Sequence, residues 1–328
     1  MKVMFVNENT KIPEISKQLY QEDINQILHN NFSEVGLDWI KHQMAWVEGS
    51  YKTFKDHEKF LIVIYLVKRT LDFYSRNFVK ISFDDFFAKD QLEIEKFSII
   101  EISKDLKMPK ETARRKIVEL EQGGAIKRQK KKIILDRSVF PFIKPTNTTK
   151  RISIFLSKFS EILKKHKVLD KKFDSSLIIK SITKNFSYSW KLFYELQIPI
   201  VLSWKRQFKD METWQIWGIC ILNKSYYLEL NNKSRTLSQY SKNIHKNQFG
   251  NGLSAMSISD MTSIPRATVV RKLKILIKNK YLIIDSKKRY HPNGKNLDLI
   301  NSNVSISIQN LSVFVTKILN QSLNFKNN

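Results

Sequence analysis

Apolar residues recur every three or four positions through most of the chain, which is the period of an amphipathic helix. Two runs, 60–67 and 214–222, are almost continuously apolar. Both are far shorter than the roughly 20 residues that span a bilayer, so we predict buried helices and no membrane segment. Short apolar segments at 125–128 and 133–135 predict two small strands. Because glycine and proline are scarce, with 8 and 7 residues, few tight turns and much helix are expected.

A helix, a break and a second helix are predicted between residues 102 and 122. Ile102 and Leu106 form one apolar stripe, and Lys107-Met108-Pro109 then interrupts the helix. Proline suits the first turn of a new helix because that turn does not need its missing N–H. The inward face of the second helix is formed by Ala113, Ile117 and Leu120. Two glycines, Gly123 and Gly124, end this helix.

The same pattern occurs twice. Segment 102–135 aligns without gaps on segment 258–291, with nine identical residues in 34 positions. The similarity continues outside this region, where 54–60 resembles 208–214 and the apolar pattern of 152–163 matches that of 308–319. The repeat is therefore about half the chain long, which predicts a duplicated domain rather than a short solenoid unit.

Each half is predicted to be one repeat. The first repeat covers 1–168, with its helix-turn-helix at about 98–123 and a hairpin, or wing, at about 125–135. The second covers 169–328, with its helix-turn-helix at about 254–279 and its wing at about 281–291. Segment 231–252, which is rich in Asn, Ser, Lys and Gly, is expected to be a loop. Helices 152–163 and 308–319 are expected to pack together as an internal dimer interface.

This order of elements, a helix, a turn, a basic helix and a basic hairpin, resembles the winged helix-turn-helix domains of MarR-, GntR- and IclR-type bacterial regulators. These families carry a Thr-Val-x-Arg-x-Leu-x-x-Leu-x-x-x-Gly-Leu-Ile run, to which segments 112–126 and 268–282 are similar. Asn279 and Lys280 replace the two glycines of the first copy. The resemblance implies a mainly α fold with small β-wings and two tandem winged-helix domains, each placing a recognition helix in the major groove of DNA.

The resemblance also indicates candidate DNA contacts on the second helix and the wing of each copy. In the first copy they are Lys110, Thr112, Arg114, Arg115, Lys116, Lys130, Lys131 and Lys132. In the second copy they are Arg266, Thr268, Arg271, Lys272, Lys287, Lys288 and Arg289. The first copy has more polar side chains at the start of this helix, so we expect it to specify sequence more strongly.

Charge supports a polyanionic partner. The chain has 57 Lys and Arg against 31 Asp and Glu, a formal net charge of +26, which repels itself unless a polyanion offsets it. An AT-rich coding sequence also raises the lysine content, so the positions of the lysines carry more weight than their number. Cys220 is the only cysteine, which excludes an intrachain disulfide and makes a zinc site improbable. Neither a Gly-rich phosphate loop nor a metal-ligand pattern is present, and we expect no enzymatic activity, cofactor or metal.

The sequence thus predicts a cytoplasmic, nucleoid-associated regulator that binds specific sequences in double-stranded DNA as a single-chain pseudo-dimer. Further homo-dimerisation is possible, and nothing in the sequence marks a pocket for a small effector. Two alternatives stay open. One is a plasmid- or phage-type replication initiator, and the other is an adaptor that uses winged helices to bind protein.

Overall fold

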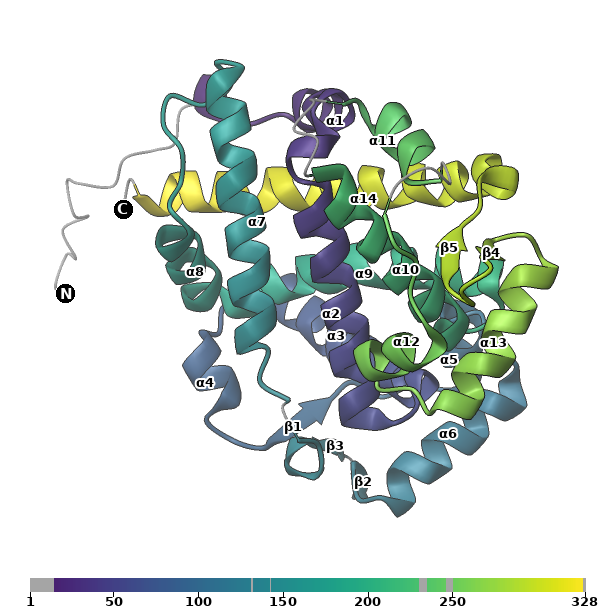
Figure 1. The fold of residues 1–328 in the computed structure, drawn as a ribbon. Coiled ribbons are helices and arrows are strands. Elements are labelled where there is room, and N and C mark those ends of the chain that lie inside the picture. The colour runs from purple at the N-terminus through teal and green to yellow at the C-terminus, as the bar shows by residue number, and fades with distance from the viewer. Residues whose placement is uncertain (1–14, 131, 142, 230–234, 246–249, 327–328) are drawn as a thin grey trace, which may run out of the picture.

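The computed structural model describes residues 15–130, 132–141, 143–229, 235–245 and 250–326. It is mainly helical with two small antiparallel sheets (Figure 1), which confirms the predicted class. None of the described helices is both long enough and apolar enough to cross a membrane.

The elements of the first half are, in chain order, η1 (Ile15–Lys17), α1 (Gln21–Asn30), η2 (Phe32–Glu34), α2 (Gly36–Phe54), α3 (His57–Arg76), α4 (Phe83–Phe87), β1 (Gln91–Ile94), α5 (Ile99–Asp105), α6 (Lys110–Gln122), β2 (Ile126–Gln129), β3 (Lys132–Asp136), η3 (Arg137–Val139) and α7 (Thr146–Lys165). Those of the second half are α8 (Ser175–Lys184), α9 (Phe186–Phe208), α10 (Met211–Glu229), α11 (Leu237–Ile244), α12 (Ala255–Thr262), α13 (Arg266–Lys278), β4 (Leu282–Ile284), β5 (Tyr290–Pro292), η4 (Gly294–Asn296) and α14 (Leu297–Lys326).

From α8 onward the second half follows the order of elements that the first half shows from α1, except that its described residues include no counterpart of η2 and none of β1 as a full strand. In the first sheet β3 lies between β1 and β2. In the second sheet β5 pairs with β4 and also forms a single bridge from Tyr290 to Leu253, so Leu253 occupies the position of β1. Both sheets therefore have the same strand arrangement around the hairpin.

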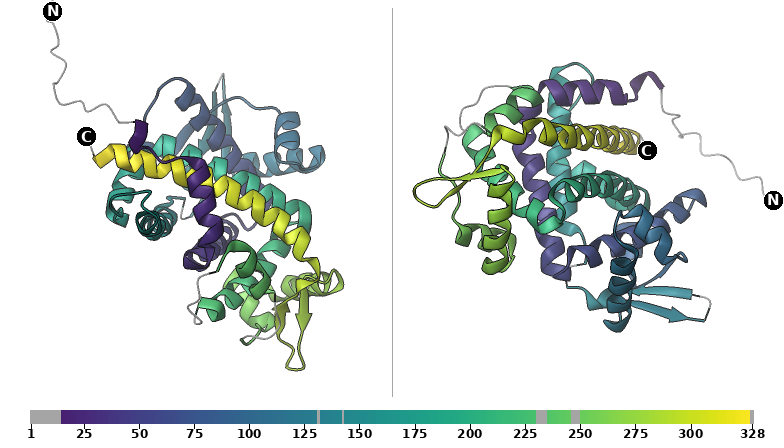
Figure 2. Two further views of the ribbon diagram at one scale, coloured as in Figure 1. Left: turned by 90° about the horizontal axis from the view of Figure 1, so that it is seen from above. Right: turned by 90° about the vertical axis from the view of Figure 1, so that its right-hand side faces the viewer.

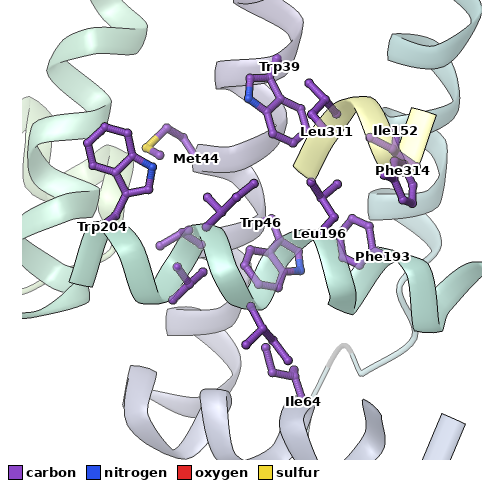
Figure 3. Packing of buried hydrophobic residues seen from close by; sticks show 14 of the residues in the cluster. Trp39, Met44, Trp46, Ile64, Ile152, Phe193, Leu196, Trp204, Leu311 and Phe314 are labelled. Atoms are coloured by element: carbon purple, nitrogen blue, oxygen red, sulfur yellow. The ribbon is translucent and has the colours of Figure 1, made fainter. Parts of the chain in front are cut away.

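The core is built where α2 and α3 of the first half meet α9 and α10 of the second (Figure 3). Trp46 on α2 contacts Phe60 on α3 and Phe193 on α9, with ring centroids 5.1 and 5.9 Å away. Helices α2 and α10 approach closely at Gly218, where an added Cβ would clash with the sulfur of Met44. Because the buried apolar residues form one continuous cluster, the two halves share a single core.

Two long helices close this core from outside, but not in the way the sequence predicted. Helix α14 runs across the molecule (Figures 1 and 2) and packs mainly against α9, α1 and α8, with only a short contact to α7. Helix α7 packs chiefly against α8 and α2. The expected α7–α14 interface is therefore minor, because the apolar stripes of both helices are occupied by other helices.

The segment predicted as a loop before the second helix-turn-helix contains a helix. Helix α11 begins with a capping box, in which Thr236 and Gln239 satisfy each other's backbone N–H groups. Its buried residues include Leu237, Tyr240 and Ile244. The local composition did not predict this helix, because α11 has only eight residues and these are too few to show a helical period. Residues 230–234 and 246–249 of the same segment lie outside the described residues.

A buried chain of hydrogen bonds crosses between the halves. His57, at the start of α3, donates from Nε2 to Oε1 of Gln215 on α10, 3.2 Å away, in the tautomer that this oxygen favours. The Gln215 amide donates in turn to the carbonyl oxygen of Thr262, the last residue of α12, at 3.0 Å. The hydroxyl of Ser50 lies 3.1 Å from His57 Nδ1. The end of α12 is thus linked through Gln215 of α10 to the start of α3.

We predict that His57 makes folding depend on pH. Burial lowers its pKa to about 4, although the Gln215 hydrogen bond and the charges of Asp56 and Asp210 oppose this shift. Since the folded-state pKa lies below the usual 6.5, the neutral ring favours folding above about pH 6.5, and this contribution disappears as the pH falls towards 4. His57→Gln should therefore reduce the pH slope of the unfolding free energy by about 1.4 kcal/mol per pH unit between about pH 6 and pH 4.5.

Urea titrations across this pH range measure the slope. The matched control is His166→Gln, because the exposed His166 side chain has surroundings in the folded state that resemble those in the unfolded chain. Equal slopes for the parent and His57→Gln would contradict the prediction.

Candidate nucleic-acid interface

Two sets of elements carry the residues that the sequence singled out. We call α3, β1, α5, α6, β2 and β3 unit one, and α10, α12, α13, β4 and β5 unit two. In unit one the turn between α5 and α6 is closed by a hydrogen bond from Ser103 Oγ to the Met108 carbonyl oxygen at 2.8 Å. In unit two Ser259 Oγ donates in the same way to the Ile264 carbonyl at 2.7 Å. Met108 and Ile264 are both buried, which fixes the angle at which α6 and α13 leave the turn.

The helix-to-hairpin junctions are also alike. The N–H of Ala125 donates to the Leu120 carbonyl, and the N–H of Tyr281 donates to the Leu276 carbonyl, both at 2.9 Å. Gly124 precedes the first of these junctions with φ +73°, and Lys280 precedes the second with φ +60°. Of the two residues that replace the glycines, Lys280 adopts the left-handed conformation, whereas Asn279 has φ −85°.

One lysine of each second helix points inward and holds the unit together. Lys116 Nζ on α6 lies 2.7 Å from a carboxylate oxygen of Asp56, and Lys272 Nζ on α13 lies 2.5 Å from one of Asp210. Asp56 also accepts the backbone N–H groups of Glu58 and Lys59 at the start of α3. Burial acts to raise the pKa of Asp56, yet the hydrogen bonds from Lys116 and the backbone lower it below its usual range.

Lys116 and Lys272, which were predicted to contact DNA, therefore have a structural role. Their side chains are only 13% and 10% exposed. The Lys116 amino group joins α6 to the carboxylate that precedes α3, and the Lys272 amino group joins α13 to the carboxylate that precedes α10. Neither amino group is therefore available to a phosphate. Sequence position alone could not show this, because the partner aspartates are distant in the chain.

The exposed cations of unit one are mostly paired with carboxylates. The guanidinium of Arg114 lies against Glu111 on the same helix, with Nε 3.0 Å from Oε2. Arg115 is 3.9 Å from Glu119, which also binds Lys59 at 2.8 Å. In the hairpin, Lys132 pairs with Glu93 at 3.1 Å. Lys110 and Lys130 are exposed, Thr112 is partly buried, and Lys131 lies outside the described residues.

Unit two presents cations without acidic partners. Helix α13 contains no Asp or Glu. Its exposed Arg271, Lys274 and Lys278 are spaced so that they share one helix face. No ion pair involves any of these three among the residues that the structure describes. Arg266 is exposed at the start of the helix, and Thr268 is partly buried. Lys274 and Lys278 were not among the predicted contacts, although the spacing of three residues from Arg271 to Lys274 and four from Lys274 to Lys278 indicates one helix face.

The hairpins extend this difference between the units. In unit two Asp285 fixes the turn by accepting the backbone N–H groups of Lys287 and Arg289, each at 2.9 Å, and it pairs with His291 at 3.0 Å. Lys287, Lys288 and Arg289 are exposed around this turn. The hairpins of the two units project from opposite sides of the molecule (Figure 2). Among the described residues, no group of three or more His, Cys, Asp or Glu side chains could hold a metal ion.

We predict opposite roles for two neighbouring residues of α13. Lys272→Gln leaves Asp210 without its cation and should lower the unfolding free energy by about 1–3 kcal/mol, less than for a fully buried pair because Asp210 is partly exposed. Arg271→Gln removes an exposed charge and should change stability by no more than about 0.5 kcal/mol. Urea denaturation of both variants measures this, and an Arg271→Gln variant less stable than Lys272→Gln would refute the assignment.

Comparison of the chain with protein-family models, curated proteins and solved structures finds no significant match. The geometry of the two units, including their turns, their buried Asp–Lys pairs and their exposed cations, is therefore the basis on which a function is inferred.

Proposed function

We propose that the chain binds double-stranded DNA in a sequence-specific manner through two winged helix-turn-helix units, and that it acts as a transcription regulator. In this proposal α6 and α13 are the recognition helices and the hairpins β2–β3 and β4–β5 are the wings. The observation that carries the proposal is the exposed face of Arg271, Lys274 and Lys278, on a helix without acidic residues that follows a fixed turn.

We further propose that the two units arose by duplication of one domain. Backbone conformation supports this, because residues with positive φ recur at equivalent places. These pairs are Lys55 and Lys209 before the first helix, Lys107 and Ser263 in the turn, Gly124 and Lys280 after the second helix, and Lys130 and Lys288 in the hairpin. Positive φ is uncommon for residues other than glycine, so four matched pairs together with matched Asp–Lys contacts favour common ancestry over chance.

The electrostatics of unit two suit a duplex. An α-helix fits the major groove, and an exposed row of cations beside it can meet phosphates along the groove edge. Such contacts release counterions from DNA, so their strength falls as salt rises. Unit one offers fewer unpaired cations on its second helix. We therefore assign the larger share of phosphate contacts to unit two, and base reading in unit one to Lys110 and Arg114.

The shared core suits a single-chain pseudo-dimer. A single winged helix makes few phosphate contacts, and covalent linkage holds a second unit at high effective concentration. Because both first helices are packed into one core, the two units keep a constant separation. A bound site should therefore contain two half-sites at one fixed spacing, and these should differ from each other because α6 and α13 differ.

Selection of bound sites from random duplex DNA tests sequence preference and spacing. On the selected site, changing Arg271, Lys274 and Lys278 together to glutamine should flatten the plot of log affinity against log salt concentration by about 0.9 for each lost phosphate contact. The matched control changes Lys164, Lys167 and Lys171, three exposed lysines at the end of α7 and beyond it, to glutamine. This control should keep the parent slope.

Two results would overturn the proposal. One is the recovery of no preferred sequence, and the other is equal slopes for both triple variants. Binding to repeated sites together with melting of adjacent AT-rich DNA would replace the role of regulator with that of a replication initiator. If the affinity for DNA does not fall as the salt concentration rises, the alternative of an adaptor that binds protein would be favoured instead.

Glu111 generates a separate prediction. It places a negative charge in the first turn of α6 and holds the guanidinium of Arg114. Glu111→Gln should release Arg114 and remove repulsion from phosphates, so DNA affinity should rise about threefold to tenfold. Glu161→Gln removes an equal charge from α7 and serves as the control. Weaker binding by Glu111→Gln, measured by fluorescence anisotropy at fixed salt, would show that Glu111 itself contacts a base.

A further inference from the structure

A cavity of about 550 Å³ lies between α2, α3, α4, α7 and the end of β3 of the first half and α9 of the second. Its volume falls within the range of pockets that hold one small organic molecule. One wall is aromatic and includes Trp46, Phe86, Phe87 and Trp190. The exposed Gly49 of α2 also lines it, so the cavity reaches the surface there.

Arg137, which directly follows β3, lines this cavity as a buried cation. Its guanidinium carbon lies over the rings of both Phe86 and Phe87, 4.7 and 4.8 Å from the ring centroids. Nη2 donates to the carbonyl oxygens of Phe86 and Lys89, and Nε donates to that of Asp90. The residue is 3% exposed, yet Nη1 is buried without a hydrogen-bond partner. Arg137 forms no ion pair with any described residue. Its charge is therefore buried without a counter-ion, and one of its N–H donors has no acceptor.

A second arginine shares the cavity. Arg151 of α7 donates from Nη2 to Thr148 Oγ1 at 3.3 Å, while its Nε is buried without a partner. The one carboxylate that lines the cavity is Glu48, and it is paired with Lys52 at 2.6 Å. Four cations, Lys52, Arg137, Lys144 and Arg151, therefore surround the cavity against a single anion.

The start of α7 adds backbone donors. Thr146, Asn147 and Thr148 form its first turn and line the cavity. This turn contains no acidic residue, and no side chain caps it. The first N–H groups of a helix have no partner within the helix, and its dipole favours an anion at this end.

We propose that this cavity binds a small amphipathic organic anion. Its carboxylate, sulfonate or phosphate group lies against Arg137, Arg151 and the start of α7, and its apolar part lies against the aromatic wall. Nη1 of Arg137, which is buried without a hydrogen-bond partner, donates to the anionic group. Inorganic phosphate satisfies the cations but leaves the aromatic wall uncovered, so the complete ligand has both parts.

The same cavity is connected to unit one. Arg137 is adjacent to Asp136, which binds Lys127 of the hairpin at 2.7 Å. Phe60 and Ile64 of α3 line the cavity, and Asp56, the partner of Lys116 on α6, caps the start of α3. An occupant therefore contacts elements that set the positions of both α6 and its hairpin. This regulatory role rests on the proposed function, whereas ligand binding itself does not.

Isothermal titration calorimetry of the full chain without DNA tests the binding. The probes are 2-naphthoate, decanoate, the neutral 2-naphthalenemethanol and inorganic phosphate. We expect one-to-one binding of the two organic acids, at least tenfold tighter than that of the alcohol or of phosphate. No saturable binding of either acid up to about 1 mM, or equal affinity for the acid and the alcohol, overturns the proposal.

Variants locate the site. Arg151→Gln should weaken naphthoate binding at least tenfold. Gly49→Leu should abolish it, because a Cβ at Gly49 meets no atom within 4 Å and the added side chain has room to occupy the cavity. Neither change removes a contact that Arg137 makes with the fold, and leucine also favours a helix over glycine. Arg128→Gln, on the surface of the hairpin, is the control and should bind like the parent. Parent-like affinity in both Arg151→Gln and Gly49→Leu places the ligand elsewhere and refutes the assignment.

Discussion

The structure depends on the crossing of α2 and α3 with α9 and α10. Each half contributes two long helices whose apolar residues are covered by the other half, and side chains such as Trp46 and Phe193 meet at the crossing. Full burial of one such side chain contributes about 1.5–3 kcal/mol, so this crossing contributes directly to the stability that the two halves share. The crossing requires α2 and α10 to approach closely at Gly218. A larger residue there would displace Met44 and separate the two helices.

Much of the local structure was predictable from the sequence. The turn before α6, the hairpin after it and their second copies follow from short-range signals, namely apolar spacing, Pro109 and Pro265, and residues that end a helix. The long-range packing was not predictable, because an apolar stripe shows that a helix buries one face without showing which partner covers it. Helix α14 has the stripe expected of it but packs on α9 rather than mainly on α7. Whether residues 168 and 169 mark a domain boundary stays a prediction.

The candidate interface shows the same limit. Basic residue types on α6 and α13 were visible in the sequence, but their pairing was not. Lys272 and Arg271 are neighbours of similar charge, and only the position of Asp210 makes one structural and the other exposed. Arg114 was predicted to contact DNA, and in the structure the nearby Glu111 holds its guanidinium. The cavity beside Arg137 involves five helices and a strand end, so no local pattern could indicate it.

The unequal charge of the two units has a consequence for how the molecule would lie on a duplex. A symmetric dimer presents identical surfaces at both ends and cannot distinguish one direction along DNA from the other. Here α6 carries an acid in its first turn and α13 carries none, and a common core prevents the two from exchanging places. A complex of this chain with DNA would therefore have polarity, with a defined upstream and downstream side set by the protein alone.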